Sequence, residues 1–289
     1  MAARPRTLPA AIAPVLVGSA AAVYEGGGDE FRWGAFVAAL LGSIFIQVGT
    51  NLVNDYSDAK RGADTVDRLG PVRVTSAGLV APRSVLVATW VAFGVALAAG
   101  IYLATVVGPI ILAVGAVSIL AGVLYTGGPR PYGYAGLGEV FVFLFFGLVA
   151  VNGSYYVQLE ELAWLPFGLS VAVGAISTAI LVVNNVRDME TDARAGKRTL
   201  AVRIGRDATR RFFLVLLALA FATLPLTLAA TETSAWPLLA LLSVPLAARA
   251  ADPVLHRTDG PALNGALART GALLAAFSVL ASAGLLIAG

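Results

Sequence analysis

Long apolar windows recur along the whole 289-residue chain, and they restrict its possible folds more than any other feature. Hydrophobic residues make up 58% of the sequence and charged residues 13%, whereas soluble domains average about 45–50% and about 25%. A helix needs about 20 apolar residues to cross a bilayer, and within it every backbone polar group is paired. We therefore predict an all-α, polytopic membrane protein and not a soluble domain with a large core.

Nine of these windows are predicted to span the membrane, within one membrane domain that covers residues 1–289. Most of them reach the length of about 20 residues that a spanning helix requires. They are residues 8–24, 34–54, 84–103, 106–125, 138–158, 163–186, 212–230, 235–250 and 265–288. The first contains Pro9 and Pro14 and the eighth contains Pro245, but proline is commoner in membrane helices than in soluble ones.

The basic residues support this number of spans, since 19 of the 20 lysines and arginines fall on one side of the predicted membrane. They lie in the N-terminal segment and in or beside loops 55–83, 126–137, 187–211 and 249–264, and only Arg32 falls on the other side. Cytoplasmic loops carry an excess of Lys and Arg. We expect a cell-membrane protein with its N-terminus and basic loops in the cytoplasm and its C-terminus outside. The N-terminal residues also have the composition of a signal peptide, but losing the first span would break this alternation.

Acidic and amide side chains gather where the second predicted span ends, in the stretch TNLVNDYSDAKRGAD (residues 50–64). Asn51, Asp55 and Asp58 are spaced i, i+4 and i+7, so they share one face of a helix. A charged side chain deep in a bilayer costs about 2.5–3.5 kcal/mol on insertion scales, and such residues usually face a bundle interior or a wet cavity. Acids at span ends also occur as solvated caps, but the paired spacing favours a functional site.

The end of the sixth predicted span repeats this pattern, in the stretch NNVRDMETDARAGKRT (residues 184–199). Asn184, Asp188 and Asp192 are spaced i, i+4 and i+8, again on one helix face. A glycine follows each acidic cluster. Because like carboxylates repel or take up protons, two facing clusters need cations between them.

Any metal ion held here must have oxygen ligands, because the chain has no cysteine and a single histidine. This favours Mg²⁺, which takes one or two carboxylates and completes its octahedron with water and phosphate oxygens. Two facing acidic clusters could thus hold a diphosphate through Mg²⁺. Basic side chains near them could neutralise the remaining phosphate charge, or could simply follow the positive-inside pattern. They are Lys60, Arg61, Arg187, Lys197 and Arg198.

The stretch NLVNDYSDAKRGAD resembles the first aspartate-rich motif of the UbiA superfamily of intramembrane prenyltransferases, and NNVRDMETDARAGKRTLAVRIG (residues 184–205) resembles its second. Two further stretches are ARPRTLPAAIAPVLVG (residues 3–18) and YTGGPRPYGYAGLGEVFVFLFFGLVAVNGSYYVQ (residues 125–158). Together the four stretches narrow the similarity to the branch that prenylates 1,4-dihydroxy-2-naphthoate in menaquinone biosynthesis. With the spans between them, the resemblance covers essentially the whole chain.

The resemblance implies nine helices around a central cavity, with both motifs at its cytoplasmic mouth. It places Asn51, Asp55 and Asp58 at one Mg²⁺–diphosphate contact and Asp188 and Asp192 at the other. It implies further substrate contacts at Asn54, Asp64, Tyr125, Arg130, Asn184 or its neighbour Asn185, and the basic pair Lys197 and Arg198. Arg130 stands where related branches commonly have lysine. Gln47, one turn before Asn51, is expected either to bond another helix or to contact the aromatic acceptor.

The implied reaction transfers a polyprenyl group from polyprenyl diphosphate to 1,4-dihydroxy-2-naphthoate, with loss of diphosphate and CO₂, to give a demethylmenaquinone. The expected partners are these two substrates and the lipid bilayer, with no nucleic acid, and the oligomeric state stays open. Phe141, Phe143, Phe145 and Phe146 are expected to line the prenyl tunnel or to pack against lipid and protein. Two alternatives remain: another aromatic acceptor such as 4-hydroxybenzoate, or a secondary transporter, whose sites usually lie nearer the membrane midplane.

Overall fold

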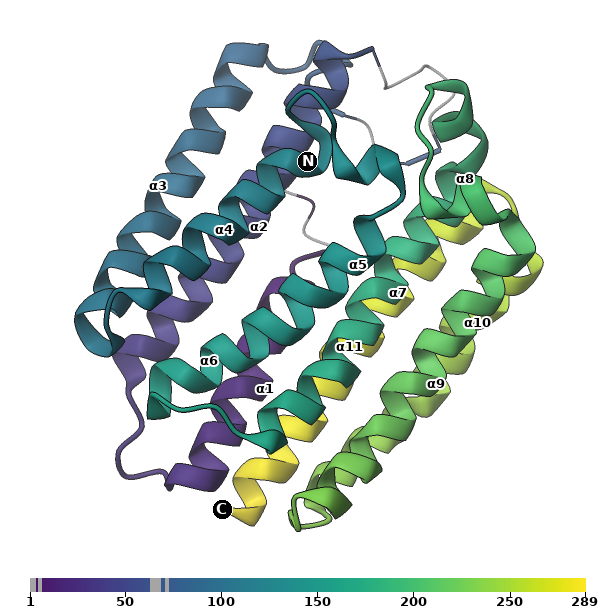
Figure 1. Ribbon diagram of the computed structural model, residues 1–289. Coiled ribbons are helices and arrows are strands. Elements are labelled where there is room, and N and C mark those ends of the chain that lie inside the picture. The colour runs from purple at the N-terminus through teal and green to yellow at the C-terminus, as the bar shows by residue number, and fades with distance from the viewer. Residues whose placement is uncertain (1–3, 5–6, 63–68, 71–72) are drawn as a thin grey trace.

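The computed structural model describes residues 4, 7–62, 69–70 and 73–289, and their regular structure is entirely helical. Figure 1 shows long helices that run roughly parallel, joined by short segments at the two ends of the bundle. The helices are α1 (Pro9–Gly26), α2 (Trp33–Lys60), α3 (Pro82–Val107), α4 (Ile110–Thr126), η2 (Tyr132–Ala135), α5 (Gly138–Val142), η3 (Phe143–Val149), α6 (Ala150–Leu159), α7 (Trp164–Arg194), α8 (Leu200–Ile204), α9 (Arg206–Ala230), η4 (Trp236–Ser243), α10 (Val244–His256) and α11 (Gly260–Ala288).

The all-α, polytopic fold predicted from the apolar windows is confirmed. Eight helices in the described residues are long and apolar enough to cross a membrane, and α4, with 17 residues, is a shorter apolar helix among them. The two helices that carry the acidic clusters end later than predicted, since α2 continues to Lys60 and α7 to Arg194 where the windows end at residues 54 and 186. Both acidic clusters therefore lie on helices and not in loops.

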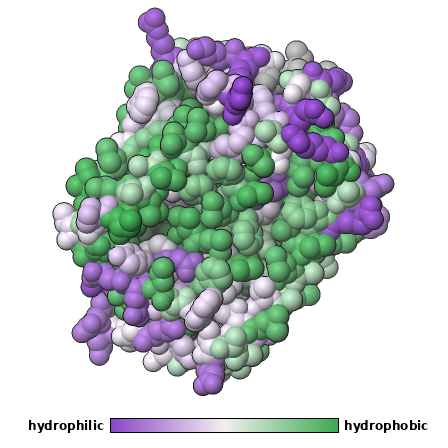
Figure 2. All heavy atoms as spheres, viewed as in Figure 1, coloured by the Kyte–Doolittle hydropathy of each residue, from purple (hydrophilic) through white to green (hydrophobic). Residues whose placement is uncertain are grey.

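The outer surface of the bundle is apolar over its middle. Figure 2 shows hydrophobic residues across the centre of the visible face and hydrophilic ones gathered toward the ends. Large apolar side chains such as Val87 and Trp90 on α3 and Leu226 on α9 are more than half exposed. Soluble monomers rarely expose contiguous apolar surface on this scale, so this face is suited to contact with lipid.

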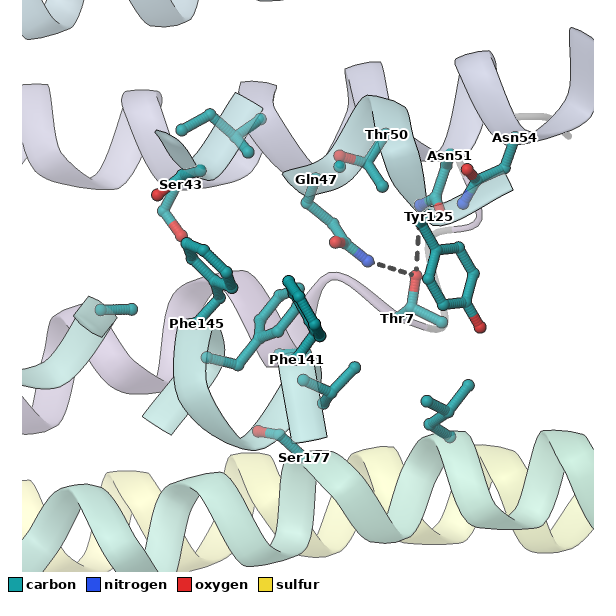
Figure 3. A pocket seen from close by; sticks show the side chains of 18 of the residues that line it. Thr7, Ser43, Gln47, Thr50, Asn51, Asn54, Tyr125, Phe141, Phe145 and Ser177 are labelled. Carbon is teal, nitrogen blue, oxygen red and sulfur yellow. Dashed lines mark hydrogen bonds between the residues drawn. The ribbon is translucent and has the colours of Figure 1, made fainter. Parts of the chain in front are cut away.

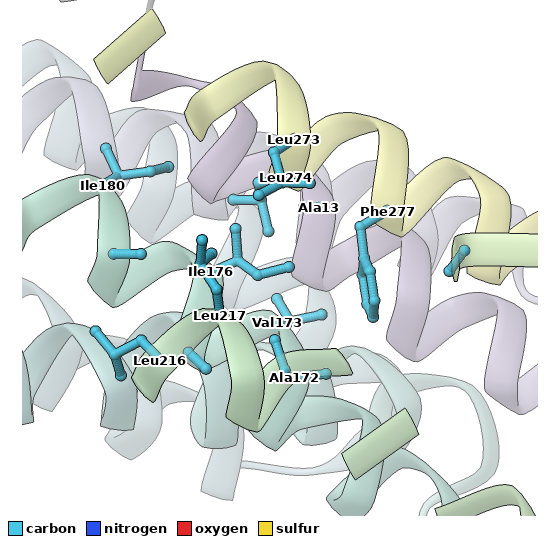
Figure 4. Close-up of a cluster of buried hydrophobic side chains, with 14 of the residues drawn as sticks. Ala13, Ala172, Val173, Ile176, Ile180, Leu216, Leu217, Leu273, Leu274 and Phe277 are labelled. Atoms are coloured by element: carbon cyan, nitrogen blue, oxygen red, sulfur yellow. The ribbon is translucent and has the colours of Figure 1, made fainter. Parts of the chain in front are cut away.

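Helix α7 is the most enclosed of the candidate spans in the described residues, with 78% of its apolar window buried. It packs against α9, η3 and α11. Figure 4 shows Val173 and Ile176 of α7 near Leu217 of α9 and Leu273 and Leu274 of α11. A helix that is apolar on all sides is buried within a bundle. The second acidic cluster thus lies at the end of the most enclosed of these described spans.

The α5–η3–α6 segment approaches α7 very closely at two glycines. A Cβ atom placed on Gly147 would lie 2.7 Å from the Cα of Gly174, closer than real side chains come. Small residues at such a crossing allow the two backbones to pack together. The crossing lies within η3, a π-helical segment, a form that is frequent at functional sites.

Helices α2 and α7 end in the same way. Gly62 and Gly196 have φ of +64° and +75°, a left-handed conformation that glycine adopts without steric cost. Each glycine lies four residues after the last aspartate of its cluster, Asp58 or Asp192. Figure 1 places the ends of the two helices toward the same end of the bundle.

Candidate active site

A cavity of about 340 Å³ lies between α1, α2, α3, α4, η3, α6 and α7. Side chains of both acidic clusters line one part of it. Small and apolar residues line another part, among them Gly42, Gly100 and Leu103. Figure 3 shows side chains of α2, of the α5–η3 segment and of α7 facing this space. An apolar cleft with a few convergent polar groups is the usual form of a ligand site.

Asp58, only 1% exposed, is held by three donors at the polar part of the cavity. Arg73 donates to its Oδ2 at 2.8 Å, and the Tyr134 hydroxyl donates to its Oδ1 at 2.6 Å. The ammonium of Lys197 lies 3.3 Å from the same Oδ2. A buried charge of this kind is stable only when it is paired and hydrogen-bonded, so the arrangement satisfies the Asp58 carboxylate.

Lys197 connects the two acidic clusters. Its Nζ is 3.3 Å from Asp58 and 3.8 Å from Oδ1 of Asp192, and its side chain is only 9% exposed. The same ammonium lies 4.8 Å from the ring centroid of Tyr134, within the range of a cation–π contact. The first cluster, on α2, and the second, on α7, therefore meet across one buried positive charge.

Asp55 is buried, but it does not belong to the cavity lining. Its two carboxylate oxygens accept the backbone N–H groups of Thr75 at 3.1 Å and Val74 at 3.2 Å. In this position Asp55 anchors the segment that also carries Arg73, and thereby supports the partner of Asp58.

The predicted amide residues of α2 line the cavity. The amide groups of Gln47 and Asn51 both donate to the Thr7 hydroxyl, at 3.3 and 3.4 Å, as Figure 3 shows. Asn54 accepts a hydrogen bond of 2.8 Å from Thr126 of α4. Gln47 thus bonds a neighbouring segment and also faces the cavity, and its contact with the aromatic acceptor stays a prediction.

Asp188 of the second cluster is paired with the adjacent Arg187, which is 1% exposed. The guanidinium binds both carboxylate oxygens, at 2.8 and 2.6 Å, in the bidentate geometry that arginine favours. It also donates to Asn184 at 2.7 Å and to Asn264 of α11 at 2.8 Å. Asn184, Asp188 and Asp192 line the cavity, whereas Arg187 does not and instead fixes Asp188 from behind.

Four predicted basic contacts have exposed side chains and do not line the cavity: Lys60, Arg61, Arg130 and Arg198. Arg61 donates to the carbonyl of Gly128, and the backbone N–H of Arg198 donates to the Tyr134 carbonyl at 2.9 Å. These contacts hold the η2 region in place. Asp64, another predicted contact, lies outside the described residues.

Aromatic rings form one wall of the cavity. Tyr125 and Tyr132 have ring centroids 5.4 Å apart, and Tyr132 stacks on Phe141 at 3.9 Å. Phe141 continues to Phe145 at 6.1 Å, and both line the cavity together with Phe146, whereas Phe143 does not. Burial raises the pKa of Tyr132 above its usual value, so its phenol is neutral.

Sequence reasoning missed several residues of this site. Arg73 and Tyr134 bind Asp58, and Thr7 binds two amides of α2, yet none of the three belongs to an aspartate motif. Tyr134 is contained in the stretch YTGGPRPYGY, which the resemblance singled out, so a signal existed for it. Arg73 is one of five basic residues of its loop, and nothing in the sequence distinguishes it from the others.

The donor set at the polar part of the cavity fits Mg²⁺. Carboxylates of Asp58, Asp188 and Asp192 and the amide of Asn51 provide hard oxygen ligands on two facing helices. In the part of the chain that the structure describes, no three acidic or histidine side chains converge on one point. The Lys197 ammonium lies between Asp58 and Asp192, so these two acids already stabilise a positive charge at this place.

Three known proteins with sequences similar to this chain share one description. The chain is 45% identical to a 1,4-dihydroxy-2-naphthoate octaprenyltransferase of Mycobacterium tuberculosis, over 99% of this chain and 96% of that protein. It is 39% identical to a protein of the same description from Escherichia coli, over 94% of this chain and 90% of that one. A protein of the same description from Bacillus subtilis is 30% identical, over 98% of this chain and 90% of that protein.

Solved structures share the fold at low sequence identity. The apo structure of a UbiA homolog from Aeropyrum pernix K1 has a TM-score of 0.72 and 13% identity, over 97% of both chains. A UbiA homolog from Archaeoglobus fulgidus, bound to DMAPP and Mg²⁺, has a TM-score of 0.64 and 15% identity, over 96% of this chain and 98% of that one. The sequence profile of the UbiA prenyltransferase family matches residues 11–262. The chain therefore belongs to the UbiA prenyltransferase family.

Proposed function

We propose that the chain transfers a polyprenyl group from polyprenyl diphosphate to 1,4-dihydroxy-2-naphthoate, with release of diphosphate and CO₂. The new carbon–carbon bond joins the allylic carbon to the naphthalene ring, and the bond to the carboxyl group breaks. The product is a demethylmenaquinone in its hydroquinone form, which balances the reaction without an oxidant. The relatives of at least 30% identity that carry the name 1,4-dihydroxy-2-naphthoate octaprenyltransferase support this choice of acceptor.

The observation that carries the proposal is the meeting of the two acidic clusters at Lys197, beside a cavity with aromatic and apolar walls. A diphosphate needs positive charge at its oxygens, whereas a prenyl chain needs apolar surface. This cavity offers both within one space. A transporter would need neither a diphosphate-sized polar part nor a long apolar extension, so the geometry favours the transferase.

The protein's own cations act on the leaving group. Lys197 and Arg73, both buried at Asp58, can stabilise the negative charge that develops on the diphosphate as the allylic C–O bond breaks. Mg²⁺, bound at Asp58 of the first cluster and at Asp188 and Asp192 of the second, would add to this stabilisation. Fixed charges of this kind act more strongly in a site that excludes water than they would in bulk solvent.

The walls of the cavity protect the cationic prenyl fragment. The faces of Tyr132, Phe141 and Phe145 provide π-electron density that can stabilise an allylic cation. The apolar lining keeps water from adding to the cation before the ring attacks. Toward Gly42 and Gly100 the described lining residues carry no ionisable groups, which suits the remainder of the prenyl tail.

The membrane orientation is part of the proposal. Most basic side chains lie at the end of the bundle that carries both acidic clusters, and the positive-inside pattern makes this end cytoplasmic. The water-soluble diphosphate would then leave toward the cytoplasm while the apolar product stays in the bilayer.

The test is an assay of the purified chain with a labelled prenyl diphosphate and Mg²⁺. Dihydroxynaphthoate and 4-hydroxybenzoate are supplied separately, and prenylated product and labelled CO₂ are both measured. We expect product and CO₂ in equal amounts with dihydroxynaphthoate only. Product with 4-hydroxybenzoate, without CO₂, would assign another acceptor, and no product with any aromatic acceptor would refute the proposed function.

A further inference from the structure

A second polar pair lies beside the acidic clusters, formed by Glu139 on α5 and Asn185 on α7. We propose that this pair directs the carbonyl oxygen of Asn185 into the cavity, where it accepts a hydrogen bond from a hydroxyl group of the aromatic acceptor. Glu139 is then a positioning residue, and Asn185 distinguishes hydroxylated rings from others. This inference rests on the function proposed above and adds to it a means of recognising the acceptor.

The orientation of the amide follows from the chemistry of the pair. Nδ2 of Asn185 donates to Oε1 of Glu139 at 2.8 Å, and the two residues are 5% and 4% exposed. Because Oε1 of Glu139 accepts this bond, the NH₂ group of Asn185 faces Glu139. Its carbonyl oxygen therefore points away from Glu139. Asn185 lines the cavity, while Glu139 lies behind it.

A purely structural role does not explain the carboxylate. Within the part of the chain that is described, Oε2 of Glu139 is buried and has no hydrogen-bond partner. A buried carboxylate that is only half satisfied costs more than a neutral or apolar side chain of similar size. Ionisable residues inside a membrane bundle usually serve a function for this reason. Fixing the direction of a neighbouring amide is a function that an acceptor oxygen at this place can serve.

The surroundings of the pair suit a flat ring. Gly138, next to Glu139, leaves room for Tyr125, since a Cβ at residue 138 would lie 3.2 Å from the Tyr125 ring. Tyr125, Tyr132 and Phe141 form the aromatic wall at this place. A naphthalene ring can pack against such faces while its hydroxyl group meets a fixed acceptor.

The position along α7 also suits the reaction. Asn185 lies three residues before Asp188, which corresponds to about 4.5 Å of helix rise. An acceptor ring bound at Asn185 would thus lie next to a diphosphate held at the acidic clusters. The ring carbon and the allylic carbon must be neighbours of this kind before they can react.

The experiment varies the pair in the full-length chain and measures KM for each substrate separately. In Glu139→Leu, KM for dihydroxynaphthoate should rise about tenfold, because the amide loses its partner and rotates. The KM for polyprenyl diphosphate should stay within about twofold of its normal value. Glu139→Gln should stay close to the parent protein, because the glutamine carbonyl can still accept from Asn185.

A double substitution makes the test independent of folding defects. Asn185→Asp alone places two carboxylates together and should raise the KM for dihydroxynaphthoate at least tenfold. Adding Glu139→Gln to it should restore most of the affinity, because the glutamine amide then donates to one oxygen of the new carboxylate and leaves the other facing the cavity. As a control, Asn152→Ala should leave both KM values unchanged, since Asn152 donates to the Leu148 carbonyl of its own segment and does not line the cavity.

An acceptor analogue without hydroxyl hydrogens completes the design. 1,4-Dimethoxy-2-naphthoate, used as a competitive inhibitor, should bind all variants equally. The inference is overturned if its inhibition constant changes in parallel with the KM for dihydroxynaphthoate, if Glu139→Leu leaves that KM unchanged, or if the double variant shows no recovery. If the parent protein prenylates 4-hydroxybenzoate instead, the proposed function fails, and the same KM series with that hydroxylated acceptor tests the pair.

Discussion

Replacement of Lys197 by methionine tests whether the junction of the two acidic clusters is the reaction centre. Methionine keeps most of the side-chain volume and removes the charge. Lys197 lies 3.3 Å from Asp58 and 3.8 Å from Asp192, and these are its two ion pairs at the cavity. In Lys197→Met, the leaving diphosphate would lose one buried cation.

The expected magnitude follows from these distances. At an effective dielectric constant of about 20, unit charges at 3.3 and 3.8 Å attract by about 5 and about 4 kcal/mol. Desolvation of the buried ammonium offsets much of this attraction in the free protein. Removing one fixed donor from developing transition-state charge typically costs about 2.7–4 kcal/mol, a factor of about 10²–10³ in rate. We expect a loss of this size in kcat/KM for polyprenyl diphosphate.

The fold should survive the substitution, because Asp58 keeps Arg73 at 2.8 Å and Tyr134 at 2.6 Å. The assay is steady-state prenyl transfer by purified protein, with thermal unfolding in detergent measured in parallel. Arg211→Met is the control, since Arg211 is exposed and donates a hydrogen bond to the Asp207 carbonyl of its own helix.

A kcat/KM for Lys197→Met within about threefold of the parent would refute the reasoning. A drop in unfolding temperature that matches the drop in activity would also count against it, because the effect would then come from instability. If Lys197→Met loses activity while Arg211→Met keeps normal kinetics, the loss comes from the missing charge between the two acidic clusters and not from the net charge of this end of the bundle.

Three further predictions concern the metal and the acidic clusters. Asp188→Ala should abolish turnover while expression and membrane insertion stay normal, as immunoblotting of isolated membranes can check. Full activity of this variant would contradict a role of Asp188 in holding the diphosphate. Asp55→Ala should also abolish turnover. Because Asp55 anchors the backbone of Val74 and Thr75, this variant should in addition show more protease cleavage near those two residues, whereas Asp188→Ala should not. Chelation of divalent cations should stop prenyl transfer and added Mg²⁺ should restore it, and turnover that persists in chelator would exclude the metal proposal.

The spacing of the motifs predicted which residues would share a face but not which way each face would turn. Asn51, Asp55 and Asp58 all lie on α2, and only the packing of the bundle directs Asp58 into the cavity while Asp55 binds the backbone of a loop. The spacing of residues along one helix does not indicate which other segment that helix face will contact. Lys60 and Arg198 lie close in sequence to the acidic clusters, yet their side chains are exposed and do not line the cavity, because proximity in sequence does not bring a side chain into a cavity.

The sequence by itself determined the class of fold, because the length and apolarity of its windows permit little besides a helical bundle in a bilayer. It also determined the chemistry of the site, since a chain with no cysteine and one histidine can hold a metal only through oxygen. Only the tertiary structure decided that Lys197 lies between Asp58 and Asp192, that Arg73 and Tyr134 complete the site, and that Glu139 stands behind Asn185. Apart from Lys197 and Asp192, which are neighbours along the chain, these contacts join residues 15 to 139 positions apart, and such distances are set by helix packing and not by local periodicity.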